Sequence, residues 1–173
     1  MLTLAARIPI TEISVSAICR QAGLTRDTFY RHADSPVDLL ADALAAEIDP
    51  LIQQLPETEG AEDAARAVLR HVHQRAAIYR GAMQPSLAAP VQSNLELSLR
   101  RGTELWAQLH PEILPPAFAS DEAAKRIAIA FAAAGAVGAI EEWLRQSDED
   151  IDRAVELILA AAPEWWRARP VTD

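Results

Sequence analysis

Cysteine is almost absent from this sequence, since Cys19 is the single one among 173 residues. No disulfide can therefore form within the chain, and the cysteine content gives no indication of an oxidising compartment. Residues 1–7 lack the long apolar stretch of a signal peptide, and the most apolar run, residues 127–140, is too short to cross a bilayer. We therefore expect a cytoplasmic protein with no membrane role.

Motifs that carry catalysis are missing as well. The sequence has no glycine-rich phosphate loop, no nucleophile elbow and no set of histidine and glutamate residues at metal-ligand spacing. His71 and His73 lie two positions apart on a predicted helix, so their side chains point to different faces and make a poor metal pair. We expect no enzymatic activity, no metal site and no cofactor.

Negative charge is scarce only at the start of the chain. The net charge is −9, yet the first 33 residues carry four arginines against two acids, a local charge of +2, which leaves −11 for the other 140 residues. Nearly all the acidic side chains therefore lie outside the N-terminal segment. That segment is where contact with a polyanion is expected.

Apolar side chains recur at helical spacing, and no sustained alternation with a period of two is present. A chain of this length with 50% hydrophobic residues can bury a sizeable core. The fold class predicted is all-α, with short helices in residues 1–50 followed by a bundle of longer helices in residues 51–173. The boundary is expected between Pro50 and Gly60, where the helical period is lost.

Residues 14–32, SVSAICRQAGLTRDTFYRH, have the pattern of a helix-turn-helix. Ser14 is a typical cap for a first helix, Gly23 supplies the turn, and Thr25 is a typical cap for a second helix. Leu24 is predicted to be the buried residue between the two helices. Residues 28–32 place hydroxyls, an aromatic ring, a guanidinium and an imidazole on the second helix, which is the chemistry of a DNA recognition helix.

The longer run AICRQAGLTRDTFYRHADSPVDLLADAL resembles the end of the DNA-binding domain of the tetracycline-repressor (TetR) family of regulators. The shared pattern is a short helix, an Ala-Gly turn, a capped recognition helix that ends in Tyr-x-His, and a capped fourth helix with paired leucines. The residues that match the pattern are Ala22, Gly23, Thr25, Phe29, Tyr30, His32, Ser35, Leu39 and Leu40.

The resemblance implies an operator-binding surface on double-stranded DNA. Thr25, Tyr30 and His32 are expected mainly on phosphates. Asp27 suits this surface less well, because phosphates repel a carboxylate, although a carboxylate can accept from a cytosine amino group in the major groove. The full set of expected DNA contacts is Thr25, Arg26, Asp27, Thr28, Tyr30, Arg31 and His32. The chain departs from the family at Ala33, where an aromatic is usual, and at Pro36, where a lysine is usual; its first helix is also short.

The resemblance further implies a small-molecule effector, because the family commonly keeps an apolar pocket among its central helices. Large apolar residues at helical spacing are candidates for the lining, although the same pattern is typical of an ordinary core. The expected lining is His73, Tyr79, Met83, Trp106 and Phe131.

The last two long helices, about residues 121–146 and 148–162, are predicted to be antiparallel and to form a homodimer interface. Small residues allow close helix approach, and the two helices carry more apolar surface than one chain easily hides. The expected interface residues are Gly135, Gly138, Ile140, Trp143, Leu144, Ile151, Val155 and Ile158.

Together these patterns indicate a homodimeric transcription regulator, a repressor released from its operator by an apolar or amphipathic small molecule. One alternative is a member of the same family that has lost DNA binding and acts as a dimeric ligand-binding module. Ala33, Pro36 and the short first helix keep that alternative open.

Overall fold

The computed structural model describes residues 1–53, 61–84, 87–146 and 150–167, and all regular secondary structure among them is helical. The predicted all-α class is therefore confirmed. The helices are α1 (Leu2–Ala5), η1 (Ile10–Glu12), α2 (Val15–Ala22), α3 (Arg26–Tyr30), α4 (Pro36–Gln53), α5 (Ala61–Gln74), α6 (Ala76–Ala82), α7 (Ala88–Leu109), η3 (Pro111–Ile113), α8 (Pro116–Ala119), α9 (Glu122–Gln146), α10 (Ile151–Ala161) and η4 (Glu164–Arg167).

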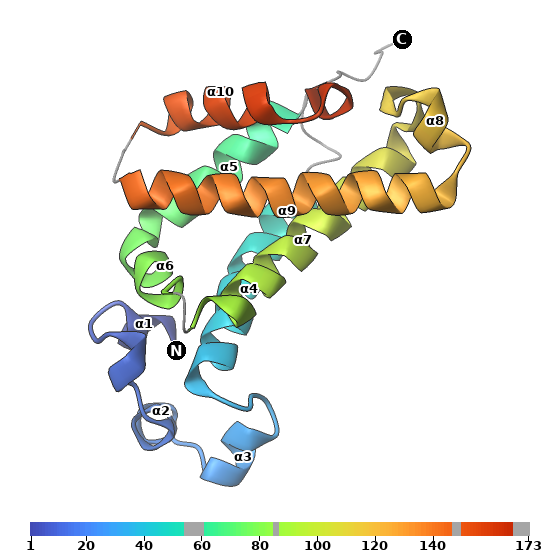
Figure 1. Cartoon of the computed structure of the whole chain (residues 1–173). Helices are drawn as coiled ribbons and strands as arrows, with labels where there is room; N and C mark the ends of the chain where they lie inside the picture. Colours follow the sequence, from blue (N-terminus) through green and yellow to red (C-terminus); the bar gives the residue numbers. More distant parts are fainter. Residues whose placement is uncertain (54–60, 85–86, 147–149, 168–173) are drawn as a thin grey trace.

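The molecule is elongated, and α4 joins its two ends (Figure 1). Helices α2 and α3 form one tip, while α9 and α10 lie side by side at the opposite end. Helix α4 begins after Ser35, whose Oγ accepts a hydrogen bond from the backbone N–H of Asp38 at 3.2 Å. It then continues through Pro50 to Gln53, which lies inside the boundary region expected between Pro50 and Gly60. Residues 54–60 of that boundary lie outside the described residues.

The two expected regions, 1–50 and 51–173, share one hydrophobic core. A single cluster of buried side chains extends from Ile10 and Phe29 near the tip, through Leu40 and Ile48 on α4, to Val155 on α10. A second cluster forms at the far end of α7 and includes Trp106 and Trp165. Helix α4 contributes buried residues to this first cluster from Leu40 to Ile52 and packs on α1, α5 and α7, so it connects the two regions.

Helix α9 is apolar around its circumference, but only one of its faces is buried. The buried face carries Ile129, Ala132, Ala133, Ala136, Val137 and Ile140. By length and composition α9 is long and apolar enough to cross a membrane, which corrects the expectation that the run is too short; 44% of its most apolar window is buried inside the protein. A core helix of a soluble protein passes the same test.

Candidate nucleic-acid interface and ligand cavity

Helix α2 begins and ends where the sequence predicts. Ser14 Oγ accepts a hydrogen bond from the backbone N–H of Ala17 at 3.2 Å, which satisfies one of the free donors at the helix start. Gly23 ends the helix with φ +67°, a left-handed conformation that side chains with a Cβ rarely adopt. Ile18 and Cys19 are buried and fix α2 on the core.

Helix α3 is shorter than the sequence pattern suggests. Thr25 Oγ1 caps it by accepting from the backbone N–H of Thr28 at 3.1 Å. Phe29 is 4% exposed and is the residue that anchors α3, whereas Leu24, the predicted anchor, is 48% exposed. Leu24 follows directly on the left-handed Gly23, and the chain there turns its side chain outward, so that prediction was wrong.

The predicted DNA contacts lie together at the free tip of the molecule (Figure 1). Tyr30 is 57% exposed, with its ring edge-on to Phe29 at a centroid distance of 5.2 Å. Arg26 donates a hydrogen bond to Ser16 Oγ on α2 at 2.6 Å. Of the seven residues expected to face DNA, Thr28 is half-buried and the others are exposed: Thr25, Arg26, Asp27, Tyr30, Arg31 and His32. Arg31 and His32 follow the end of α3 instead of lying on it.

Ala33, Pro36 and the short first helix, which depart from the family pattern, each fit the structure around them. Ala33 is buried at 9% exposure, so a small side chain fills that position of the core. Pro36 is the first residue of α4, a position where proline costs no hydrogen bond. Helix α1 has four residues and no buried one, although Leu2 and Leu4 pack partly on the core.

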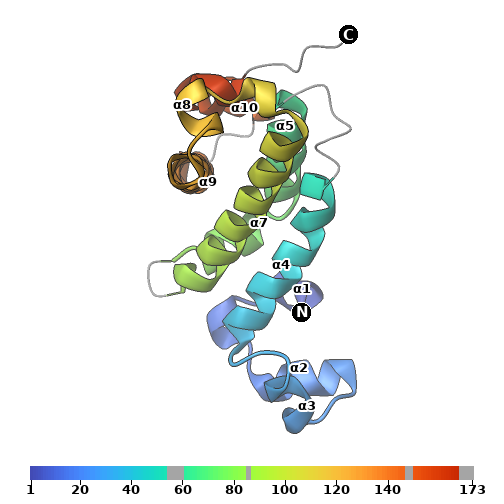
Figure 2. The same ribbon diagram turned by 90° about the vertical axis from the view of Figure 1, so that its right-hand side faces the viewer.

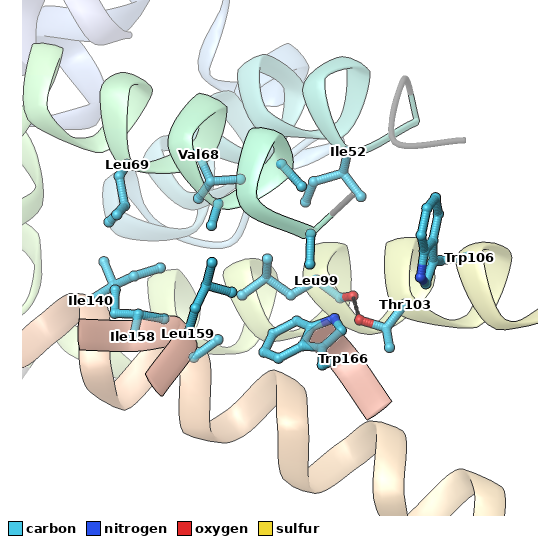
Figure 3. A pocket seen from close by; sticks show the side chains of 14 residues that line it. Ile52, Val68, Leu69, Leu99, Thr103, Trp106, Ile140, Ile158, Leu159 and Trp166 are labelled. Atoms are coloured by element: carbon cyan, nitrogen blue, oxygen red, sulfur yellow. Dashed lines mark hydrogen bonds between the residues drawn. The ribbon is translucent and has the colours of Figure 1, made fainter. Parts of the chain in front are cut away.

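An apolar cavity of about 70 Å³ lies between α5, α7, α9, α10 and the end of α4 (Figure 3). Among the described residues that line it, none is charged, and the lining is almost wholly hydrocarbon and indole. Its larger lining side chains include Ile52, Leu69, Leu99, Trp106, Ile140 and Trp166.

The cavity differs from the expected one in four of its five residues. Trp106 lines it, but Tyr79 is fully buried beside His71, and Met83 packs half-buried against the core. His73 lies outside the lining, with its ring 6.2 Å from that of Trp143. Phe131 is 73% exposed on the side of α9 that faces away from the core. Thr103 also lines the cavity and was not predicted, although its hydroxyl lies only three residues before Trp106 on the same helix.

The expected dimer interface also needs correction. Four of its members belong to the core of the single chain: Ile140, Trp143, Leu144 and Val155. Ile151 and Ile158 are half-buried against that same core. Gly135 and Gly138 are exposed and lie on the same side of α9 as Ile127 and Phe131, which are 71% and 73% exposed. We call these four residues the outer face of α9; Figure 2 shows α9 end-on at the edge of the molecule.

A polar cluster connects α4 to the junction of α5 and α6. The Arg75 guanidinium donates two hydrogen bonds to the Glu47 carboxylate, at 3.0 and 2.8 Å, and holds the pKa of Glu47 below its usual value. His71 Nε2 lies 3.2 Å from the Tyr79 hydroxyl, and its Nδ1 lies 3.8 Å from Glu47 Oε2. Burial lowers the pKa of His71, and the positive charge of Arg75 acts in the same direction, against the attraction of Glu47.

The stability of the protein is therefore expected to decrease as the pH falls from 7.5 to 5.5. The unfolded chain takes up a proton at His71 near pH 6.5, whereas the buried imidazole resists it, so the contribution is complete above that pH and is lost below it. Urea unfolding at several pH values measures this slope. The variant His71→Asn should have a flatter dependence, and an unchanged slope in that variant would contradict the assignment.

Comparisons with known proteins found no relative: no family model matches the chain, no curated protein matches it, and no solved structure matches it. Within the described part of the chain, no group of three His, Cys, Asp or Glu side chains is placed to hold a metal ion.

Proposed function

We propose that this chain is a homodimeric, DNA-binding transcription regulator of the tetracycline-repressor type, a repressor that a small molecule releases from its operator. The observation that carries the proposal is the tip formed by α2 and α3. There, a capped helix anchored by Phe29 presents Arg26 and the exposed Tyr30, and the exposed Arg31 and His32 follow directly after its end.

The chemistry of this tip suits a DNA backbone and groove. Arginine pairs with phosphates and with the guanine edge, and neutral phenol and imidazole groups donate to phosphate oxygens. Six of the seven side chains concerned are exposed, so no rearrangement of the core is needed for them to meet DNA. The local charge of +2 in a chain of −9 favours approach by this end.

Dimerisation is part of the proposal because a regulator with one short recognition helix gains affinity by reading two half-sites. The outer face of α9 is the surface assigned to the partner copy. Ile127 and Phe131 supply the exposed apolar area, while Gly135 and Gly138 leave space for a second helix to approach closely. A face used by both copies in the same way forms a two-fold dimer.

Helix α4 is the element proposed to connect ligand binding with DNA release. Its first residues follow α3, and Ile52 near its end lines the cavity. The Glu47–Arg75 pair fixes the middle of α4 to the junction of α5 and α6. If the ligand fits the cavity only when α4 occupies one of two positions, its binding favours that position. It thereby shifts the equilibrium between the form that binds DNA and the form that does not.

The second candidate is a dimeric ligand-binding module without DNA binding. Two observations favour it: the Arg26 guanidinium is engaged by Ser16 on the same tip, and Pro36 stands where the family has a cation. This candidate keeps the cavity and the outer face of α9 but gives no role to α3.

Selection from a pool of random double-stranded DNA separates the two candidates. The proposed regulator should enrich an inverted repeat, since a two-fold dimer reads the same half-site twice. A pool that stays random after repeated rounds, with the protein folded and dimeric, would favour the ligand-binding module.

A further inference from the structure

The cavity beside Trp106 has a chemistry that restricts its ligand. Its described lining contains no acid, no base and no histidine, so a charged group of a ligand would find no counter-ion there. Removing a carboxylate or ammonium from water without a partner is strongly unfavourable. The ligand is therefore uncharged over the part that enters the cavity.

Three side chains with a polar group stand in this otherwise apolar lining: Thr103 and Trp106 on α7, and Trp166 on η4, whose indole N–H is not among the buried groups that lack a partner. The indole Nε1 of Trp106 is buried and has no hydrogen-bond partner among the described residues. Thr103 Oγ1 donates to the backbone oxygen of Leu99 at 2.9 Å, which leaves its own lone pairs free to accept. The two residues are three positions apart and so are neighbours on the helix surface; in Figure 3 the nitrogen-bearing end of the Trp106 ring lies toward Thr103.

One free donor beside one free acceptor is the complement of a hydroxyl group. A hydroxyl oxygen accepts from Trp106 Nε1, and its hydrogen is donated to Thr103 Oγ1. A carbonyl or ether oxygen satisfies only the donor. A buried donor left unpaired costs free energy, so a ligand that pairs with both groups is favoured over one that pairs with neither.

The volume sets the size of the ligand. At roughly 10–15 Å³ for each water-sized group, the cavity of about 70 Å³ holds about five to seven such groups. The indoles of Trp106 and Trp166 offer flat surfaces on which a ring can pack.

We propose that this cavity binds a small, uncharged, predominantly apolar alcohol or phenol, whose single hydroxyl pairs with Trp106 Nε1 and Thr103 Oγ1. Its role as the effector rests on the proposed function, but its binding does not, because the cavity lies between α5, α7, α9, α10, η4 and the end of α4 and is far from α3.

Calorimetry on the protein without DNA tests the proposal with three probes of similar size: phenol, toluene and benzoate. Phenol and toluene should bind and benzoate should not. The variant Trp106→Phe removes the donor but keeps an aromatic ring, so phenol should bind roughly three- to tenfold more weakly while toluene changes little. Thr103→Val, which has nearly the same shape, should have the same selective effect and serves if Trp106→Phe does not fold.

The matched control is Trp143→Phe, because Trp143 Nε1 is also buried without a partner but Trp143 does not line the cavity. This variant should leave phenol affinity unchanged. Binding of benzoate as tight as that of phenol, or equal losses for phenol and toluene in both cavity variants, would overturn the proposal. Because no DNA is present in this experiment, its outcome does not test the proposed DNA binding. A protein that fails to bind DNA could still bind phenol as proposed.

Discussion

Phe131→Arg is expected to convert the protein into a monomer. Phe131 is 73% exposed at the centre of the outer face of α9, where the proposed partner copy would cover it. The outer face of α9 has no acidic side chain to pair with a guanidinium, and an unpaired buried charge costs about 3–5 kcal/mol. Light scattering at micromolar concentration should then report the 18.8 kDa chain mass instead of twice that value.

Two companion variants make this result specific. Leu97→Arg places the same charge on an apolar residue of α7 that is 44% exposed, outside the outer face of α9, and should leave the dimer intact. Gly138→Leu should also weaken the dimer without unfolding the chain, because a Cβ at Gly138 meets nothing within 4 Å. A dimer that persists in both Phe131→Arg and Gly138→Leu would show that the partner binds elsewhere.

Arg26→Ala is expected to have the largest effect on DNA binding of any single change in α3. If the guanidinium holds a phosphate, the variant should weaken specific and non-specific binding alike. If it reads a guanine, it should relax one operator position by about 1–3 kcal/mol. In either case the hydrogen bond to Ser16 is exposed, so the fold should be little changed.

The salt dependence of binding distinguishes these two cases. With two to three cations per subunit at the tip, the slope of log affinity against log salt should be roughly −4 to −5 for the dimer. Loss of a phosphate contact in each subunit makes that slope shallower by about 2, whereas loss of a base contact leaves it nearly unchanged. Arg101→Ala, an exposed arginine on α7, is the control and should change neither quantity. Unchanged operator affinity in Arg26→Ala would remove α3 from the DNA interface.

Local signals in the sequence were sufficient to predict where α2 begins and ends and where α3 begins. Ser14, Gly23 and Thr25 act through hydrogen bonds and backbone angles within three or four residues, so their roles follow from the sequence alone. The helical period likewise predicted the longer elements as helices, but it gave no signal for the short η3, α8 and η4. The prediction for Leu24 was wrong because the burial of a turn residue depends on tertiary packing. In this protein Phe29 fills the core position, and the Leu24 side chain is left exposed.

The faces of α9 could not be predicted in the same way. A helix that is apolar on all sides carries no periodic signal for its orientation, so Ile140 and Trp143 were expected at a dimer interface and lie in the core. Phe131 was expected in the cavity for the same reason. The cavity itself depends on residues far apart in sequence, such as Ile52 and Trp166, which only the tertiary arrangement brings together.

The proposed regulator reads DNA with α3 as part of a two-fold dimer. A hydroxyl-radical footprint on a duplex enriched by the protein tests it most directly, since it reports where the backbone is covered. We expect two protected patches of equal size, related by two-fold symmetry, with centres separated by about one helical turn or a multiple of it. A uniform pattern without protected patches, from a protein that is folded and dimeric, would contradict it.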